Sequence, residues 1–482
     1  MDTTALLKSV PTGLWIGGEE REGKSTFNVL DPSDDHVLTA VANGTPEDAI
    51  DALDAACAVQ AEWAATPPRE RGEILRSVFE KITERAEDIA TLMTLEMGKV
   101  LPESMGEVKY GAEFFRWFAE EAVRIAGRFT PSPAGTGRVL VTKQAVGPCY
   151  AITPWNFPLA MGTRKIGPAF AAGCTMIVKP AQETPLTMLL LAKLIDEAGL
   201  PKGVLSVLPT SSPGPITEAL VNDGRLRKLT FTGSTGVGKA LVKQSADKLL
   251  RTSMELGGNA PFVVFDDADV DAAVDGAILA KMRNGGEACT AANRFYVQRR
   301  VYDTFAAGIV ERMGQIKVGA GYDLDSMLGP MINRRAVEKI HALVEDAVSK
   351  GAERLLGGRR LDRPGHYYPP TVLGHIPADA QLLREEIFGP VVALQPFATD
   401  AEAIANANNT ELGLAAYVYT RDLQRGFRVC EQIETGMIGL NRGMVSDPAA
   451  PFGGMKQSGL GREGSHHGLI EFCEAKYVAV SW

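Results

Sequence analysis

The sequence predicts a mixed α/β fold with more than one domain, and three observations support this. The chain has 482 residues, which at about 150 residues per domain allows roughly three domains. Short runs rich in β-branched residues alternate with amphipathic helical stretches, as in parallel sheets with crossover helices. Hydrophobic residues make up 45% of the chain and charged residues 23%, the balance of an ordinary globular protein.

The alternation continues through both halves of the chain. In the first half, expected strands at 175–178, 204–208, 228–231 and 262–265 precede expected helices at 186–198, 215–221, 236–250 and 270–283. In the second half, strands at 294–298, 391–395 and 416–419 precede helices at 302–313, 400–407 and 422–433. The pattern predicts two α/β domains that meet near residue 257.

Two segments differ from this pattern. Residues 131–145 begin rich in Pro, Ser and Gly and become strand-like at 138–143, which predicts a hairpin arm. The C-terminal residues 477–482 are also strand-like. The longest uncharged stretch, 144–163, is long enough to suggest a membrane span, but three prolines and an asparagine interrupt it. We therefore expect a strand followed by a loop there.

Charge and cysteine content exclude several classes of protein. The formal net charge is −9, so we expect neither a nucleic acid nor an anionic membrane as a partner. The N-terminal residues lack the apolar segment of a secretory signal. The six cysteines contain no CxxC pair, which argues against a disulfide scaffold or a zinc ribbon. These features favour a cytoplasmic protein without a metal site.

Cys289 is a candidate nucleophile. It follows a Gly-rich turn in the stretch Arg283–Arg294, and its neighbours are glycines and polar residues. A sulfur exposed near backbone N–H groups would favour the thiolate, which is the nucleophilic form. The alternative for any single cysteine is a buried structural thiol.

Glu255 and Asn156 are candidates for acid–base chemistry and for oxyanion binding. Glu255 precedes a Gly-Gly turn at the expected domain junction, where partial burial would raise its pKa towards that of a general base. Asn156 lies in a rigid proline-flanked loop, and its amide could donate to a developing oxyanion. The alternatives are a glutamate in a surface ion pair and a turn asparagine bonded to its own backbone.

The stretch Phe231–Gly238 follows an expected strand and opens an expected helix. Such a loop lets a phosphate approach backbone N–H groups at the positive end of a helix. It matches neither the usual dinucleotide-binding pattern nor a P-loop, so only its context supports a phosphate site.

Together these stretches resemble the aldehyde dehydrogenase family. Asn156 lies 133 residues before Cys289, Glu255 lies 34 before it and Glu386 lies 97 after it, separations similar to those of the family. The resemblance runs collinearly from Asn156 to Glu463 and includes the stretches around Lys179, 385–390 and 451–463. An intact nucleophile and base argue against a catalytically silent relative, and Glu255 argues against a CoA-dependent acylating enzyme.

The resemblance implies an aldehyde dehydrogenase-like fold. A Rossmann-like cofactor-binding domain would comprise residues 1–122 and 146–257, and an α/β catalytic domain residues 258–457. Residues 123–145 and 458–482 would form a bridging element with a β-hairpin oligomerisation arm. A homodimer or homotetramer is implied.

The resemblance also implies the catalytic roles. Cys289 would attack the aldehyde carbon to form a thiohemiacetal, whose oxyanion is held by Asn156 and the Cys289 backbone N–H. After hydride transfer a thioester remains, and Glu255 would activate the water that hydrolyses it. Lys165 and Glu463 resemble a pair that relays protons to this base.

The cofactor implied is NADP or NAD. The residues implied to bind it are Thr153, Trp155, Lys179, Gln182, Gly233, Ser234, Gly238, Leu256, Glu386 and Phe388. Relatives that prefer NAD often carry Glu at the position of Gln182, where a carboxylate repels a 2′-phosphate. The neutral amide slightly favours NADP. The alternative is that Glu183 takes over this role and NAD is preferred.

The substrate implied is a small anionic aldehyde. Arg164 and Arg283 occupy positions that resemble those of the carboxylate-binding arginines in succinate semialdehyde dehydrogenases, and two guanidinium groups can clamp a carboxylate. Ser446 could add a hydrogen bond, and Phe157 and Phe452 would line the tunnel. A glutarate semialdehyde or broad-specificity dehydrogenase remains the alternative, because one methylene discriminates weakly.

Overall fold

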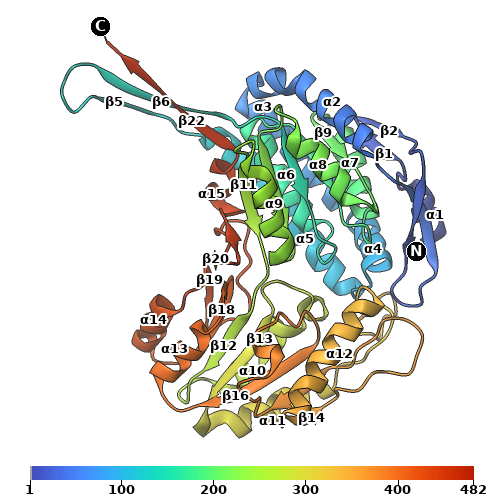
Figure 1. Ribbon diagram of the computed structural model, residues 1–482, viewed down its shortest axis with the longest axis vertical. Helices are drawn as coiled ribbons and strands as arrows, with labels where there is room; N and C mark the ends of the chain where they lie inside the picture. The colour runs from blue at the N-terminus through green and yellow to red at the C-terminus, as the bar shows by residue number, and fades with distance from the viewer. Residues whose placement is uncertain (1–2, 482) are drawn as a thin grey trace.

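One half of the molecule, in the upper part of Figure 1, is built on an eight-stranded sheet. The structure is a computed structural model that describes residues 3–481. The strand order is β2-β1-β9-β8-β7-β10-β11-β21, and the five strands from β9 to β11 are parallel. The strands are β1 (Leu14–Ile16), β2 (Glu19–Arg21), β7 (Cys149–Ile152), β8 (Met176–Lys179), β9 (Leu205–Val207), β10 (Lys228–Thr232), β11 (Arg251–Glu255) and β21 (Gly459–Leu460).

Helices cover both faces of this sheet, so its central strands are apolar on both sides. In β7, Cys149 and Ala151 pack into one core, whereas Tyr150 and Ile152 pack into the other. The helices on the first side are α3 (Pro68–Glu84), α4 (Ala86–Met97), α5 (Leu101–Glu121), α6 (Ala160–Ala172) and α7 (Leu186–Glu197). Those on the second side are α2 (Pro46–Ala65), α8 (Pro213–Asn222) and α9 (Thr235–Ala246).

A second, seven-stranded sheet forms the other half of the molecule, in the lower part of Figure 1. Its order is β14-β15-β16-β13-β12-β18-β19, and only the β14–β15 pairing is antiparallel. The strands are β12 (Ala260–Val264), β13 (Ala292–Gln298), β14 (Glu353–Leu356), β15 (Thr371–Gly374), β16 (Val391–Phe397), β18 (Ala415–Tyr419) and β19 (Met437–Leu440). The helices are α10 (Val270–Met282), α11 (Tyr302–Gly314), α12 (Arg334–Ser349), α13 (Asp400–Asn408) and α14 (Leu423–Gln432).

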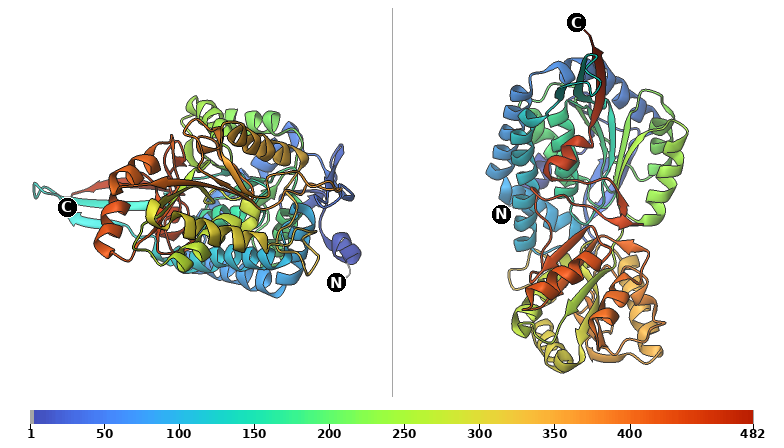
Figure 2. Two further views of the ribbon diagram at one scale, coloured as in Figure 1. Left: turned by 90° about the horizontal axis from the view of Figure 1, so that it is seen from below. Right: turned by 90° about the vertical axis from the view of Figure 1, so that its left-hand side faces the viewer.

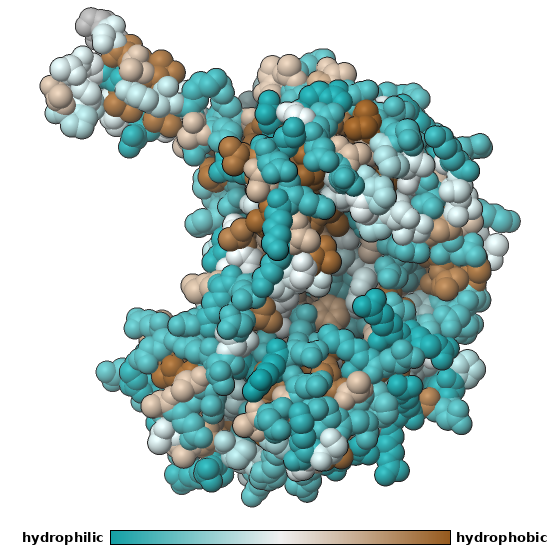
Figure 3. Space-filling model, in the orientation of Figure 1, coloured by the Kyte–Doolittle hydropathy of each residue, from teal (hydrophilic) through white to brown (hydrophobic). Residues whose placement is uncertain are grey.

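A three-stranded arm projects from the body (Figures 1 and 2). It consists of β5 (Arg128–Pro131), β6 (Arg138–Ala145) and β22 (Cys473–Val480), with β6 in the centre. Apolar and polar residues mix on its surface in Figure 3. The sequence predicted the hairpin and a C-terminal strand, although that strand begins earlier than expected and Trp482 lies outside the described residues.

The C-terminal segment does more than extend the arm. β21 pairs antiparallel with β11 in the eight-stranded sheet, and α15 (Ser465–Ile470) contacts α5 and α6. Residues 458–481 therefore divide between the body and the arm. The remaining elements are α1 (Thr3–Ser9), β3 (Thr26–Leu30), β4 (Val37–Ala42), β17 (Leu412–Gly413), β20 (Met455–Lys456) and the short 3-10 turns η1 (Ala122–Arg124), η2 (Arg283–Gly286), η3 (Arg299–Val301) and η4 (Gln381–Leu383).

The expected strands and helices are present, with shifted ends. The helix expected to reach residue 250 ends at Ala246, and the one expected to reach Arg283 ends at Met282. The uncharged stretch at 144–163 forms the end of β6, all of β7, a loop and the start of α6. Between residues 3 and 481, no helix combines the length and apolar character needed to cross a membrane.

Candidate active site

A cleft of about 610 Å³ lies between the two sheets, and most of the predicted catalytic residues line it. Asn156 follows β7, Glu255 ends β11 and Cys289 precedes β13. In open α/β sheets, ligands bind beyond the carboxyl ends of parallel strands. The sheet topology thus collects residues that lie far apart in the sequence.

The turn before Cys289 depends on left-handed backbone. Asn284, Gly285 and Gly286 have φ values of 55°, 62° and 79°. A Cβ at Gly286 would lie only 2.3 Å from the Gly389 carbonyl oxygen, so glycine is required there. This turn ends α10 and carries Cys289 into the cleft.

The Cys289 thiol is only partly exposed. Burial raises its pKa to about 12, although the charge of Arg164 acts in the opposite direction. That the backbone dipoles of the turn favour the thiolate stays a prediction, and the loss of hydration opposes it. At neutral pH the nucleophile needs a base to remove its proton.

Glu255 has the environment of such a base. It is buried, and its Oε2 atom has no hydrogen-bond partner. Burial raises its pKa well above the usual range, and the negative charge of Glu463 raises it further. The carboxyl group lines the same cleft as Cys289.

Behind Glu255 lies a buried cluster formed by Arg164, Lys165 and Glu463. Both cations form ion pairs with Glu463, and Lys165 Nζ also donates to Thr232 Oγ1 at 2.7 Å. Burial alone would raise the pKa of Glu463, but the two cations hold it below its usual value. Burial lowers the pKa of Lys165. A charged carboxylate beside a readily deprotonated lysine suits proton transfer.

Asn156 is fixed by the loop that holds the nucleophile. Its Nδ2 donates to the Glu287 carbonyl oxygen at 2.9 Å, and its Oδ1 accepts from the Phe157 backbone N–H at 3.1 Å. One amide hydrogen remains for a substrate oxyanion. The Glu287 carboxylate accepts from the Ile332 backbone N–H at 3.2 Å, and burial raises its pKa to about 8.

Six of the ten predicted cofactor residues line the cleft: Trp155, Gly233, Ser234, Leu256, Glu386 and Phe388. The Trp155 and Phe388 rings meet edge to face, 5.4 Å apart at 89°. A Cβ at Gly257 would lie 3.3 Å from both the Glu386 carboxylate and the Thr235 hydroxyl, so a side chain at this position would crowd both groups. Gly233 and Ser234 precede α9, whose positive end suits a pyrophosphate.

The other predicted cofactor residues lie outside the immediate lining. Thr153 and Lys179 are buried, and burial lowers the pKa of Lys179 to about 8. Gly238 lies against Leu256, where a Cβ would be 2.4 Å from that side chain. Gln182 is exposed, whereas its neighbour Glu183 lines the cleft.

The two predicted substrate arginines differ in their surroundings. Arg283 is half-buried, with Nη1 2.7 Å from Met444 Sδ and its guanidinium 5.0 Å from the Phe157 ring centre. Arg164 is buried, pairs with Glu463 and stacks 4.1 Å from the Phe452 ring centre. That both arginines bind the substrate carboxylate stays a prediction, and Arg164 already has an acidic partner in Glu463. Ser446 is half-buried, two residues beyond Met444.

Sequence reasoning missed a polar scaffold beneath the site. Lys99 Nζ lies 2.5 Å from Glu107 Oε2 and 2.8 Å from the Asn156 carbonyl oxygen. Glu107 Oε1 accepts from the Leu159 and Ala160 backbone N–H groups at the start of α6. The sequence lacked a distinct signal for these residues, because lysine and glutamate side chains are usually solvated, whether in a loop, as Lys99 is, or in a helix, as Glu107 is.

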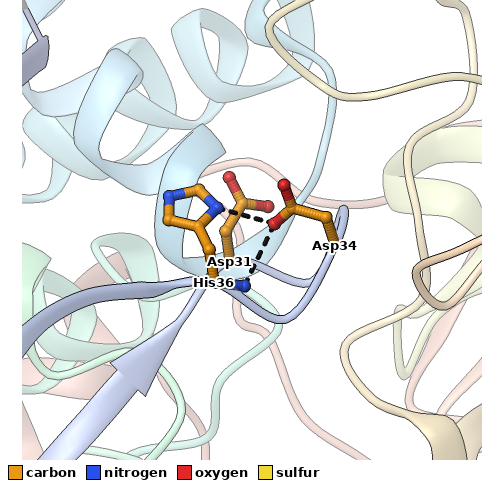
Figure 4. A group of neighbouring side chains, drawn as sticks. All are labelled: Asp31, Asp34 and His36. Carbon is orange, nitrogen blue, oxygen red and sulfur yellow. Dashed lines mark hydrogen bonds and ion pairs between the residues drawn. The ribbon is translucent and has the colours of Figure 1, made fainter.

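Sequence reasoning also missed a cluster in the β3–β4 turn. The ligand-type atoms of Asp31, Asp34 and His36 lie within 4.8 Å of one another (Figure 4). His36 Nδ1 lies 2.6 Å from Asp34 Oδ1, and Asp31 Oδ1 accepts from the Ser33 backbone N–H. These contacts account for the turn, and we assign no metal to it.

Comparisons with known proteins agree with this site. The model of the aldehyde dehydrogenase family matches residues 19–478. A succinate-semialdehyde dehydrogenase of Paenarthrobacter nicotinovorans is 56% identical, over 92% of this chain and 99% of that protein. A glutarate-semialdehyde dehydrogenase of Pseudomonas putida is 46% identical, over 97% of each chain.

A solved structure described as an Escherichia coli NADP-dependent enzyme superposes with a TM-score of 0.97 and 45% identity. The superposition covers 98% of this chain and 99% of that one. Cys289, Glu255 and Asn156 stand at one cleft between two α/β layers, as an enzyme of this kind requires. The chain belongs to the aldehyde dehydrogenase family.

Proposed function

We propose that the protein oxidises succinate semialdehyde to succinate with NADP⁺ or NAD⁺. The observation that carries this proposal is the environment of Arg283, a cation near the nucleophile that forms no ion pair with any residue from 3 to 481. Glu103, the nearby carboxylate, accepts a hydrogen bond from the Asn284 backbone instead. An unpaired guanidinium beside the reacting sulfur favours a substrate with its own carboxylate.

Arg164 contributes differently in this proposal. Its ion pair with Glu463 already compensates its charge, and its Nη2 contacts Met161 Sδ at 3.3 Å. Its positive charge still acts on the Cys289 thiol and lowers the thiol pKa against the effect of burial. We therefore assign the substrate carboxylate mainly to Arg283, and we assign Arg164 to the charge balance of the proton-transfer cluster.

The reaction consumes an aldehyde, a water molecule and NAD(P)⁺, and it yields a carboxylate, NAD(P)H and two protons. Cys289 attacks the carbonyl carbon after Glu255 takes the thiol proton, and Asn156 donates to the oxyanion. The bound nicotinamide supplies the hydride acceptor. Glu255 then removes a proton from the water that hydrolyses the Cys289 thioester, and Lys165 and Glu463 pass protons onward.

The cofactor residues fit either dinucleotide. A relative solved at 45% identity is described as NADP-dependent, and the neutral Gln182 agrees with acceptance of a 2′-phosphate. Glu183 acts against it, because its carboxylate lines the cleft and its charge acts on Lys179. We propose that NADP⁺ is accepted and modestly preferred.

The arm supports the proposal of a homodimer or homotetramer, and the six free cysteines favour the cytoplasm. Among residues 3–481, β5 and β22 each pair with β6 alone, so both edges of the arm are open. Tyr477 and Val478 on β22 are exposed. Open strand edges with apolar side chains usually pair with another chain.

The test is steady-state kinetics of the wild-type protein with succinate semialdehyde, glutarate semialdehyde and butanal, each with NADP⁺ and NAD⁺. We expect kcat/KM for succinate semialdehyde to exceed that for butanal by about 100-fold, or roughly 2.7 kcal/mol. If kcat/KM were higher for glutarate semialdehyde than for succinate semialdehyde, the preferred substrate would be the five-carbon semialdehyde and not the four-carbon one. Equal values for all three aldehydes, or a requirement for CoA, would refute the proposal.

A further inference from the structure

A single asparagine side chain joins the two loops that carry the reacting groups. Asn284 Nδ2 lies 2.9 Å from the Asn156 carbonyl oxygen and 3.1 Å from the Glu287 carbonyl oxygen. The first acceptor belongs to the oxyanion loop, and the second lies two residues before Cys289. A primary amide has two N–H groups, so Asn284 satisfies both loops at once.

The backbone of Asn284 is held just as firmly. Its N–H donates to Glu103 Oε1 on α5 at 2.7 Å, and its carbonyl oxygen accepts from the Glu287 backbone N–H at 2.9 Å. The residue is 2% exposed and left-handed, with φ 55° and ψ 37°. Asparagine and glycine adopt this conformation more readily than other residues.

The contact partners form a closed network around the proposed oxyanion donor. The Asn156 carbonyl oxygen accepts from Asn284 Nδ2 and from Lys99 Nζ, and the Glu287 carbonyl oxygen accepts from Asn284 Nδ2 and Asn156 Nδ2. The orientation of the Asn156 amide therefore depends on where the Glu287 carbonyl lies. Asn284 sets that position.

We propose that Asn284 is a positioning residue that fixes the Asn156 amide relative to the Cys289 sulfur. It acts through Asn156 and the turn before Cys289 without touching the substrate. A displacement of about 1 Å between donor and nucleophile can cost about 100-fold in rate. This inference rests on the proposed roles of Cys289 and Asn156, but not on the identity of the aldehyde.

The main test variant is Asn284→Gly, because glycine keeps the left-handed backbone and removes only the amide. We expect kcat for any aldehyde that the wild type oxidises to fall about 30-fold. The KM for the aldehyde and the dissociation constant of NADPH, measured by tryptophan fluorescence, should change less than about threefold. Asn284→Asp tolerates the same backbone and turns a donor into an acceptor facing two carbonyl oxygens, so it should lose at least as much activity.

Asn441→Gly is the matched control. Asn441 is also left-handed, with φ 54°, and its Nδ2 also donates to a backbone carbonyl, that of Thr420 at 2.9 Å. It is exposed and bonds to Thr420 instead of the loops of Asn156 and Cys289. Its replacement should leave kcat within about threefold of the wild type.

Two further readouts separate positioning from general damage. Iodoacetamide alkylates Cys289 without forming an oxyanion, so its rate with Asn284→Gly should remain within about threefold of the wild type. In a double-mutant cycle, Asn284→Gly should cost little more in kcat once Asn156 is Ala, because both changes remove one function. A kcat within about threefold of wild type for both Asn284 variants, or full additivity with Asn156→Ala, would overturn the proposal.

Discussion

The surroundings of Arg164 and Arg283 show how one residue type acquires two functions. Both charges lie near Cys289 and lower the pKa of its thiol. Arg164 is buried on α6 and paired with Glu463, whereas Arg283 lies at the end of α10, half-buried and without an ion pair among residues 3–481. A buried charge needs a partner to be tolerated. Arg164 has that partner in Glu463. For Arg283, the partner that we propose is the carboxylate of the substrate.

The largest expected effect on stability and activity comes from removing Glu463, the carboxylate that pairs with Arg164. Glu463→Gln leaves Arg164 and Lys165 as buried cations without a counter-charge, so we expect a loss of about 3–5 kcal/mol of stability. We also expect kcat to fall about 100-fold for charged and uncharged aldehydes alike, because proton transfer serves both. Urea unfolding and steady-state kinetics measure the two effects.

Glu121→Gln controls for the loss of a buried carboxylate. Glu121 is 5% exposed and pairs with Arg124 at 2.7 Å and His466 at 2.8 Å. Its partners Arg124 and His466 can be solvated because their side chains are about half exposed, so this variant should keep its kcat. If Glu463→Gln also kept its kcat, the proposal that the cluster of Arg164, Lys165 and Glu463 transfers protons would be wrong.

The pH dependence of alkylation tests how far these two cations activate the thiol. Because burial raises the pKa of Cys289 to about 12, the thiolate fraction should rise about tenfold per pH unit between pH 7 and 9. The iodoacetamide rate constant of the cofactor-free protein should follow the same slope. A plateau near pH 7.5 would show that Arg164 and Arg283 outweigh burial.

Glu287 is a buried carboxyl group that, unlike Glu463, has no cation bonded to it among residues 3–481. Its folded pKa of about 8 lies above the ordinary value of 4.5, so the folded state binds the proton more tightly than the unfolded state. Its stability contribution is complete below about pH 4.5 and is lost as the pH rises towards 8. Glu287→Gln should therefore lose on the order of 3 kcal/mol less stability than the wild type between pH 5 and 8.

Urea unfolding at several pH values measures this difference. Glu113→Gln, a change at an exposed glutamate of α5, is the control for removal of one negative charge. An unchanged pH slope for Glu287→Gln would mean that the buried carboxyl does not hold its proton.

The smallest effect concerns the adenosine end of the cleft. Glu183→Gln removes the carboxylate that lines the cleft near Lys179. We expect the ratio of kcat/KM for NADP⁺ to that for NAD⁺ to rise about fivefold to tenfold. An unchanged ratio would show that Glu183 does not select the cofactor, and Gln182→Glu would then be the informative variant.

The sequence predicted the fold because alternating apolar runs and helical stretches are local patterns that indicate the two sheets. The Gly-rich turn and the proline-flanked loop made Cys289 and Asn156 candidates, and the family resemblance implied their roles. The structure brings both residues to one cleft, and their roles stay a prediction. The ends of helices were less certain: α10 stops one residue early because Asn284 and Gly285 take left-handed conformations.

Most pairing across the fold could not be predicted from the residues themselves. The resemblance implied the Lys165–Glu463 pair, but nothing in the sequence indicated that Arg164 also pairs with Glu463. Nor did it indicate that Lys99 and Asn284 bond to the Asn156 loop. The high pKa of Cys289 depends on burial, which the sequence around the residue does not reveal. Sequence patterns therefore found the charged groups without showing which were already paired.

The most direct test of this account is the effect of Arg283→Met on substrate preference. Methionine keeps an apolar contact with Phe157 and removes only the charge, and Arg283→Lys is the control that retains a charge. We expect KM for succinate semialdehyde to rise about 100-fold and KM for butanal to change less than about threefold, because only one of them carries a carboxylate. Equal changes for both aldehydes would contradict the central claim that Arg283 recognises the substrate carboxylate.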